Sequence, residues 1–566
     1  MSPLKAYGKV EEAQQAMLEA RRKTRKRLTI ISLSSILLAA IVVAAVLGTR
    51  ASSSNNGDQS KGAISTSIKA VCDVTLYKDS CYNSLAPLAK SDHLQPEELF
   101  KLSMQVAMNE LSEASQYFFS TDYVTDKTTS LALKDCRDLI DLALDHLNGS
   151  LSSTNDVSVL DIVDDLRSWL SAAGSCQQTC IDGLEEAGKI NGKDYLKNST
   201  ELISNSLAII TWIYKVSSTV NMRRLLNYPK NDRATMKMPT WLHEKERKLI
   251  ESKDLKLKAD AVVAKDGSGK YKRISDALKA VPSKSKKRFI IYVKKGIYLE
   301  NVRIEKSKWN VMVIGDGMDA TIVSGNLNVV DGTPTFSTAT FAVFGKGFVA
   351  RDVGFENTAG AIKHQAVALM SNGDQSIFYR CSFNAFQDTL YAHSNRQFYR
   401  ECNIYGTVDF IFGNSAVVIQ NSNILPRRPM NGQQNTITAQ GRFDPNQNTG
   451  ISIQNCTIKS FGNLSDVKTF LGRPWKNYST TVFMQSMMPS FIQPSGWLPW
   501  TGNTAPPTIF YAEFENFGPG SSTKNRVKWR GLKNITKRIA TKFTVKEFLQ
   551  GDKWIPETGI SFRPGL

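Results

Sequence analysis

Short segments that resemble one another recur about every twenty residues in the C-terminal half of the chain, and this repetition constrains the fold most strongly. FYRCSF (378–383) resembles FYRECNI (398–404), and IQNSNI (419–424) resembles IQNCTI (453–458). Each is a short β-forming run with polar turn residues, and such a unit buries its apolar face only by stacking on its neighbours. We therefore predict an all-β solenoid, a parallel β-helix. A β-sandwich is the alternative, although a sandwich does not require similarity between segments.

An uncharged apolar run, LTIISLSSILLAAIVVAAVLG, occupies residues 28–48. It is long enough to cross a bilayer as a helix, and a cluster of Lys and Arg precedes it within residues 1–27. Because positive flanks stay in the cytoplasm, residues 1–27 should be cytoplasmic and the bulk of the chain exported. The length of the run favours an uncleaved signal anchor over a cleaved signal segment, and both remain open. Contact with a membrane is expected only here.

The remaining chain divides by composition. Residues 49–65 form a polar linker of small residues, and residues 66–221 have few Gly and Pro, with apolar residues three and four apart. That spacing predicts amphipathic helices, here an all-α four-helix bundle. Residues 222–256 form a basic linker without periodicity, and residues 257–566 carry the β-rich repeats. We expect a helical domain followed by a β-helix.

The basic linker contains a candidate processing site. Arg223 and Arg224 are followed by Leu225 and Leu226, within a stretch that also holds two prolines. A dibasic pair is a target for a subtilisin-type protease, but a solvated basic stretch would look the same.

Charge and cysteine content restrict the partners. The formal net charge is +19 with a pI near 9.4, which favours a polyanion such as nucleic acid, an anionic membrane or an acidic polysaccharide. No aromatic RNA-binding motif or zinc-finger spacing supports nucleic acid. The eight cysteines are disulfide candidates in an exported chain.

Amide and carboxyl side chains recur at a spacing that matches one coil of the predicted solenoid. Gln365 and Gln387 are 22 residues apart, and Asp409 follows Gln387 by another 22. Residues one coil apart stack on the same face of a solenoid, so we expect two amides and a carboxylate in one groove, with Asp388 beside them. Stacked glutamines and a turn-forming Asp388 are also common structural features.

Asp409 and the LGRPW stretch complete the candidate site. Asp409 lies between Val408 and three apolar residues, where a carboxylate must be paired or functional. Arg473 and Trp475 of LGRPW are either an ordinary cation–π pair or part of the same groove.

These motifs together resemble a known family. Residues 257–560 resemble the catalytic domain of plant pectin methylesterases through GIYLE (296–300), QAVAL (365–369), QDTL (387–390), DFIFG (409–413) and LGRPW (471–475). The stretch CDVTLYKDSCYNSL (72–85) resembles the pectin methylesterase inhibitor domain, which is a pro-region in many family members. RRLL (223–226) resembles the processing motif between the two domains.

The resemblance implies a right-handed parallel β-helix and an esterase without metal or cofactor. It would be secreted to the cell wall, and it would convert methyl-esterified homogalacturonan to pectate and methanol. The N-terminal domain would be an intramolecular inhibitor that a processing protease removes. The implied roles are nucleophile for Asp409, proton donor and then base for Asp388, oxyanion donor for Gln387 with Gln365, and substrate contacts for Thr335, Arg473 and Trp475.

The resemblance also implies three disulfides: Cys72–Cys81, Cys136–Cys180 and Cys381–Cys402. The family often has cysteine where this chain has Ser422, so Cys456 is expected to be a free thiol, and Cys176 is an extra cysteine. The five histidines show no triad or ligand spacing, and His364 and His393 are expected in surface positions or loops.

Two rival functions remain. A pectin depolymerase, either a glycoside hydrolase or a lyase, would also use acidic groups on a β-helix. A protein without activity would combine an inhibitor domain with a pectin-binding solenoid.

Overall fold

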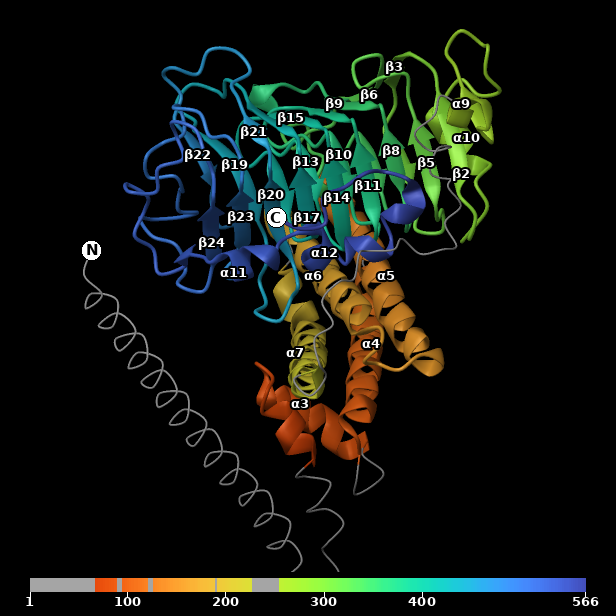
Figure 1. Ribbon diagram of the computed structural model, residues 1–566. Coiled ribbons are helices and arrows are strands. Elements are labelled where there is room, and N and C mark those ends of the chain that lie inside the picture. The colour runs from red at the N-terminus through yellow and green to blue at the C-terminus, as the bar shows by residue number, and fades with distance from the viewer. Residues whose placement is uncertain (1–66, 89–93, 121–125, 189–190, 226–253) are drawn as a thin grey trace, which may run out of the picture. The chain divides into compact units, whose positions relative to one another are not determined.

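The computed structural model describes residues 67–88, 94–120, 126–188, 191–225 and 254–566 (Figure 1). The apolar run at 28–48, both of its flanks and Leu226 with most of the basic linker lie outside these residues. None of the described helices is long and apolar enough to span a membrane. Residues 67–90 and 94–566 belong to one compact unit, which contains both the helices and the strands.

The helical domain is a four-helix bundle, as predicted. α4 (Pro96–Ser120) packs on α5 (Lys127–Asp156) and on α7 (Gly192–Leu225), and α6 (Val163–Ala187) packs on α5 and α7. Buried Leu, Ile, Ala and Cys side chains follow one stripe of α5 at helical spacing. The side chain of Asp126 caps α5 by accepting a hydrogen bond of 2.9 Å from the Thr129 amide.

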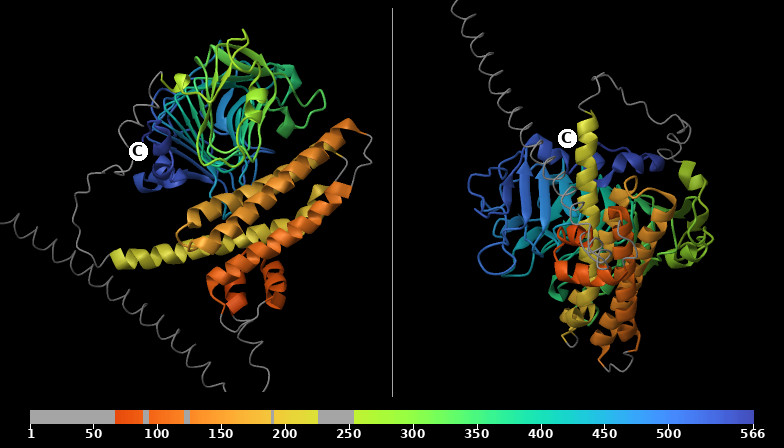
Figure 2. Two further views of the ribbon diagram at one scale, coloured as in Figure 1. Left: turned by 90° about the vertical axis from the view of Figure 1, so that its right-hand side faces the viewer. Right: turned by 90° about the horizontal axis from the view of Figure 1, so that it is seen from below.

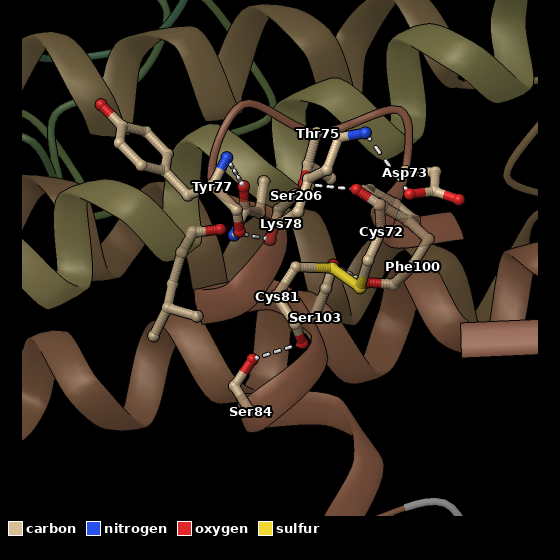
Figure 3. Close-up of a disulfide and its surroundings, with 12 residues drawn as sticks. Cys72, Asp73, Thr75, Tyr77, Lys78, Cys81, Ser84, Phe100, Ser103 and Ser206 are labelled. Carbon is tan, nitrogen blue, oxygen red and sulfur yellow. Dashed lines mark hydrogen bonds and ion pairs between the residues drawn. A yellow bond between two sulfur atoms is a disulfide. The ribbon is translucent and has the colours of Figure 1, made fainter. Parts of the chain in front are cut away.

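Two disulfides pin this bundle, and both were predicted. Cys72–Cys81 ties the start of the domain to the short helix α3 (Lys78–Leu85), as Figure 3 shows. Cys136–Cys180 joins α5 to α6. Closing loops in the unfolded chain stabilises such a domain by about 2–4 kcal/mol per disulfide.

Residues 261–534 form a parallel β-helix of three sheets, confirming the predicted fold (Figure 2, left). The eleven-stranded sheet has the order β1-β2-β5-β8-β11-β14-β17-β20-β23-β24-β25. A seven-stranded sheet, the site sheet, has the order β4-β7-β10-β13-β16-β19-β22, and another has the order β3-β6-β9-β12-β15-β18-β21. Neighbouring strands of these three sheets are parallel throughout the described residues, so successive coils lie directly on one another.

The strands of the eleven-stranded sheet are β1 (Ala261–Val263), β2 (Phe289–Val293), β5 (Val311–Ile314), β8 (Val349–Arg351), β11 (Ser376–Tyr379), β14 (Arg396–Arg400), β17 (Ala416–Gln420), β20 (Gly450–Gln454), β23 (Thr480–Met484), β24 (Phe510–Phe514) and β25 (Leu532–Asn534). Those of the site sheet are β4 (Val302–Ile304), β7 (Phe341–Val343), β10 (Leu369–Ser371), β13 (Leu390–Ala392), β16 (Ile411–Gly413), β19 (Asn435–Gln440) and β22 (Thr469–Gly472). The third sheet has β3 (Gly296–Leu299), β6 (Thr321–Gly325), β9 (Gly354–Asn357), β12 (Ser382–Asn384), β15 (Asn403–Gly406), β18 (Asn423–Pro426) and β21 (Thr457–Ile458).

The internal repeats set the register of the coils. In IQNSNI and IQNCTI, Ile419 pairs with Ile453 and Ile424 pairs with Ile458, as the similarity predicts. FYRCSF and FYRECNI pair one residue differently, because Phe378 lies opposite Tyr399 rather than Phe398. Their rings stack inside the coil with centroids 4.7 Å apart, so the core places aromatic rings above one another.

Short elements cover both ends of the long sheet. α12 (Val545–Leu549) packs against β14 and β17, and α11 (Lys537–Thr541) contributes Ala540 to a buried cluster with Val482. α9 (Asp254–Leu257) and α10 (Ile274–Lys279) lie at the other end of the β-helix (Figure 1).

The predicted third disulfide is wrong. Cys381 and Cys402 are buried free thiols, level with each other on adjacent coils. The Cys402 thiol instead donates to the carbonyl oxygens of Phe378 and Arg400, at 3.4 and 3.3 Å. The two cysteines therefore occupy the same position in successive coils without a bond between their sulfur atoms.

This position continues along the β-helix as a ladder of small side chains. Ser422 follows Cys402, and the Cys402 amide donates to its hydroxyl at 3.1 Å. Cys456 follows Ser422, and the Cys456 amide donates to the hydroxyl of Ser486 at 3.1 Å. Cys456 is free, as predicted, and so is Cys176 in α6.

Candidate active site

Asp388 and Asp409 lie level with each other on adjacent coils. β13 pairs with β16 so that Leu390 lies opposite Ile411, a shift of 21 residues, and the Asp388 amide donates to the Val408 carbonyl at 3.1 Å. This register corrects the prediction that Gln387 stacks on Asp409. The predicted stacking of Gln365 on Gln387 is confirmed, because these two residues form a parallel bridge.

The two aspartates share the same unusual backbone conformation. Asp388 has φ 63° and Asp409 has φ 53°, both in the left-handed region, where Asp is among the few residues found with any frequency. Such conformations persist where the surrounding structure holds them, and they concentrate at functional sites. Each aspartate comes just before a short strand of the site sheet, so the two carboxyl groups reach one cavity.

Asp409 is held by a cation and a hydroxyl. The guanidinium of Arg473 donates through Nε to Oδ1 at 2.9 Å and through Nη2 to Oδ2 at 2.7 Å. The Thr436 hydroxyl donates to Oδ1 at 2.6 Å. Asp409 is only 4% exposed, so this bidentate pair offsets the cost of burying its charge.

Asp388 has the opposite environment. It is 8% exposed, and no described side chain donates a hydrogen bond to its carboxyl oxygens. Burial raises the pKa of Asp388 well above its ordinary value, and the charge of Asp409 raises it further, while Arg473 lowers it. A carboxyl whose pKa is raised therefore lies beside one that is paired with a guanidinium, and two such different environments are typical of carboxyls with different roles.

Aromatic rings form one wall of the cavity. Trp475 lies 6.1 Å from Phe412, and Phe412 stacks on Tyr391 at 4.2 Å between ring centroids. The alternative that Arg473 and Trp475 are only a cation–π pair does not hold, because the guanidinium of Arg473 lies over Trp500, 4.3 Å from the ring centroid.

Gly441 allows the close approach of the Trp475 ring to this wall. A Cβ atom at this position would lie 2.8 Å from the ring, so any residue other than glycine would displace the indole.

The cavity has a volume of about 410 Å³ and is lined by both domains. The β-helix contributes all of the predicted site residues: Thr335, Gln365, Gln387, Asp388, Asp409, Arg473 and Trp475. The helical domain contributes residues of α5 and α6, among them Asp182 and Glu186. The bundle therefore covers the candidate site in this structure. No group of three or more His, Cys, Asp or Glu in the described ranges is placed to hold a metal ion.

Direct bonds join α6 to the rim of the cavity. Asp182 forms an ion pair of 2.6 Å with Lys476, next to Trp475. The Thr335 hydroxyl donates to Glu186 at 3.0 Å, and burial raises the pKa of Glu186. Thr335, which is expected to contact substrate, is thus hydrogen-bonded to a carboxylate of the helical domain.

Comparison with known proteins identifies both domains. A family model described as Pectinesterase matches residues 260–552, and one described as Plant invertase/pectin methylesterase inhibitor matches residues 66–209. The chain belongs to the pectinesterase family.

Some relatives of this pectinesterase match it over nearly its full length, and a solved structure matches about half of it. "Pectinesterase/pectinesterase inhibitor 24" of Arabidopsis thaliana is 56% identical over 99% of both chains. "Pectinesterase 3" of Phaseolus vulgaris is 49% identical over 99% of this chain and 98% of its own. The pectin methylesterase from carrot matches 54% of this chain and 98% of its own length, with a TM-score of 0.54 and 52% identity. The chain is a carboxylic ester hydrolase, a pectin methylesterase with an inhibitor domain.

Sequence reasoning missed several groups around this pectinesterase site. Trp500 lies in the stretch GWLPW (496–500), for which no role was expected. Thr436 and Lys476 have no motif of their own and are recognised only by their contacts. Asp182 and Glu186 reach the site from a distant segment.

His393 lies in the loop between β13 and β14, one of the two predicted locations, but it is not at the surface. His393 is 1% exposed and lies in the contact between the domains, where its Nε2 is 2.9 Å from the Thr179 hydroxyl. Burial lowers the pKa of His393 to about 3, and the nearby His146 lowers it too. A buried neutral imidazole here serves packing between the domains. His364 is exposed, as predicted.

Proposed function

We propose that this pectinesterase hydrolyses methyl esters of homogalacturonan with Asp409 as the nucleophile and Asp388 as the acid and base. The observation that carries the proposal is the contrast between the two carboxyls. Arg473 forms a bidentate ion pair with Asp409, which suits a carboxylate nucleophile, while the raised pKa of Asp388 on the adjacent coil favours its protonated form.

The first half of the reaction would form an acyl-enzyme. An Asp409 carboxylate oxygen attacks the ester carbonyl carbon of a methylated galacturonate, and the carbonyl electrons move to the oxygen. When this intermediate collapses, the bond to the methoxy oxygen breaks and Asp388 gives its proton to that oxygen. The products are methanol and an anhydride between Asp409 and the galacturonate.

The second half would restore the site. The Asp388 carboxylate, now without its proton, takes one from a water molecule as the water attacks the galacturonyl carbon. Cleavage of the anhydride returns the Asp409 carboxylate and releases the free galacturonate. One water is consumed and one methanol is released, with no net change in the enzyme.

Gln387 and Gln365 would stabilise the oxyanion of both intermediates. Their side chains line the cavity on two adjacent coils, and their amide groups supply N–H donors. One such donor contributes about 3 kcal/mol to lowering the barrier. Trp475 would offer its ring face to the sugar, Arg473 would position it beside the nucleophile, and Thr335 would contact it from the rim.

The helical domain would act as an intramolecular inhibitor. α6 covers the cavity and occupies Thr335 and Lys476 with its own carboxylates. α7 extends to Leu225. We propose that a processing protease recognises the motif formed by Arg223, Arg224, Leu225 and Leu226, and that its cut separates the two domains. The covalent link would then no longer keep the bundle over the site.

We also propose that the chain is exported to the cell wall, where its substrate lies. The basic net charge of +19 would hold it on acidic pectin, an attraction that salt weakens. The segment at 28–48 would direct export and anchor the precursor in the membrane.

The test is release of methanol from methylated pectin by chain that has been cleaved in the linker. The proposal expects methanol without shortening of the polysaccharide. Shortened or unsaturated oligosaccharides would support a depolymerase instead. Release of methanol at the same rate before and after cleavage would contradict inhibition by the helical domain but leave the esterase mechanism standing.

A further inference from the structure

A second cavity between the helical domain and the β-helix lies apart from the candidate active site. It has a volume of about 830 Å³, and α6, α7, the loop 442–449 and the segment around α12 line it. None of the proposed site residues takes part. We call it the arginine groove, after Arg167 of α6 and Arg442 of the β-helix.

The loop 442–449 is tightly bound to the helical domain. The Ser204 hydroxyl donates to Asp444 at 2.5 Å, and the Gln447 amide donates to the Ser171 carbonyl at 3.2 Å. The Asn448 amide donates to the Ser168 hydroxyl at 3.0 Å. The arginine groove is therefore complete only while the two domains are in contact.

The two arginines are partly buried, and neither forms a direct ion pair with a described carboxylate. No described carboxylate lies within 4.0 Å of either guanidinium, although Asp164 is one turn before Arg167 on α6. The buried Nε of Arg167 has no hydrogen-bond partner among the described residues, and its guanidinium rests over Tyr214 at 5.0 Å. Arg442 donates mainly to backbone carbonyls of its own loop, Asp444 and Pro445.

The arrangement is costly without a counter-charge. Burial lowers the pKa of Arg442 to about 10, and the charge of Arg167 is among the groups that lower it further. Burying two like charges near each other is unfavourable unless a group of opposite charge joins them. The lining also has three lysines against three carboxylates, so the groove as a whole carries excess positive charge: Arg167, Arg442, Lys542, Lys546 and Lys553 with Asp164, Glu547 and Asp552.

The rest of the lining suits a sugar that bears a carboxylate. Phe510 stacks on Phe543 with centroids 5.4 Å apart, and Phe548 continues this aromatic wall. Amide and hydroxyl side chains, Gln550 and Thr508 among them, line the same space and can bond sugar hydroxyls. Guanidinium groups bind carboxylates in a bidentate geometry that matches a uronate.

We propose that the arginine groove binds the carboxylate of a de-esterified galacturonate oligomer between Arg167 and Arg442. The choice of galacturonate rests on the proposed function, whereas the anion site rests on the two arginines. Because both domains build the groove, a ligand there binds the associated domains more tightly than the separated ones. By linkage it stabilises the covered form of the enzyme, so the reaction product would hold the uncleaved chain inactive.

The test is calorimetric titration of the full-length chain with trigalacturonate at fixed ionic strength. One saturable site per chain is expected. Arg167→Gln should weaken it about tenfold or more, because a charged hydrogen-bonded pair is lost. The double variant Lys546→Gln/Lys553→Gln, at exposed rim positions, should weaken it about threefold. Arg530→Gln removes an exposed charge outside the groove and should have no effect.

Two further arms separate the alternatives. Arg473→Gln disables the candidate active site and should leave this binding unchanged. If binding is lost in Arg473→Gln but kept in Arg167→Gln, the oligomer occupies the active site and the proposal is overturned. Inorganic phosphate should bind more weakly and compete. Equal affinity for phosphate and trigalacturonate would overturn the assignment to galacturonate, and absence of binding by both would overturn the site.

Discussion

The guanidinium of Arg473 donates hydrogen bonds to both carboxyl oxygens of Asp409. A similar arginine–aspartate ion pair lies outside the cavity. There, Arg380 donates to Asp352 at 2.6 and 2.7 Å, and Asp352 also has a left-handed backbone, with φ 57°. The two pairs have the same chemistry and the same local conformation. The first pair lies beside Asp388, a second carboxyl with a raised pKa, so the two pairs can be used to test the proposed catalytic role of Asp409 against a purely structural one.

Asp409→Asn should lower methanol release about a thousandfold or more, because an amide does not form the acyl intermediate. Asp352→Asn is the matched control and should stay within about twofold of the parent, since it breaks an equivalent ion pair outside the site. Both are measured on cleaved enzyme, with circular dichroism to confirm folding. Equal losses in the two variants would mean that ion-pair stability, not nucleophilicity, explains the effect.

Because the pKa of Asp388 is raised, we expect both the reaction rate and the stability of the enzyme to depend on pH. Its proton is needed for methanol to leave, so kcat/KM should fall as pH rises through its raised pKa. The folded pKa lies above the unfolded value of about 3.9, so its stabilising contribution is complete below that value. This contribution is then lost as pH rises through the folded pKa.

Asp388→Asn removes this titration. The melting temperature of the variant should decline less than that of the parent as pH rises above about 4, while its methanol release falls about a hundredfold or more. Melting curves across pH, with matched activity assays, test both statements. An unchanged pH slope of the melting temperature would show that Asp388 is ionised in the folded enzyme.

The sequence predicted the β-helix well because its repeats are local and their side chains alternate between core and turn. It misjudged the register at the site by one residue. Gln365 pairs with Gln387 at a spacing of 22, but Leu369 and Leu390 are 21 apart, so the second coil is one residue shorter than the first between these two pairs. This one-residue difference places Asp388, rather than Gln387, level with Asp409.

The covering of the site by α6 could not be read from the sequence. Asp182 and Lys476 are separated by almost three hundred positions, and neither belongs to a pattern that predicts contact. Family resemblance predicted an inhibitor domain, but not which side chains it places in the cavity. These depend on how two separately folded surfaces meet.

The ion pair between Asp182 and Lys476 should help to hold the domain over the site. Asp182→Asn in the uncleaved chain should raise methanol release about three- to tenfold, since a partly buried ion pair contributes roughly 1 kcal/mol to association. After cleavage and removal of the helical domain, parent and variant should be equally active. Asp194→Asn, exposed on α7, is the control. A variant as inactive as the parent before cleavage would show that other contacts hold the domain.

The cysteine ladder makes a prediction about thiol chemistry. In the unfolded, unreduced chain four thiols should react: Cys176, Cys381, Cys402 and Cys456. A count of two would mean that Cys381 and Cys402 are bridged after all. Cys402→Ser should cost about 1 kcal/mol or less in unfolding free energy, because Ser422 and Ser486 fill the equivalent place on other coils and a hydroxyl also donates to a carbonyl. Cys402→Phe overfills the same closely packed position and should cost about 3 kcal/mol, so chemical denaturation of the two variants separates a requirement for small size from a requirement for sulfur.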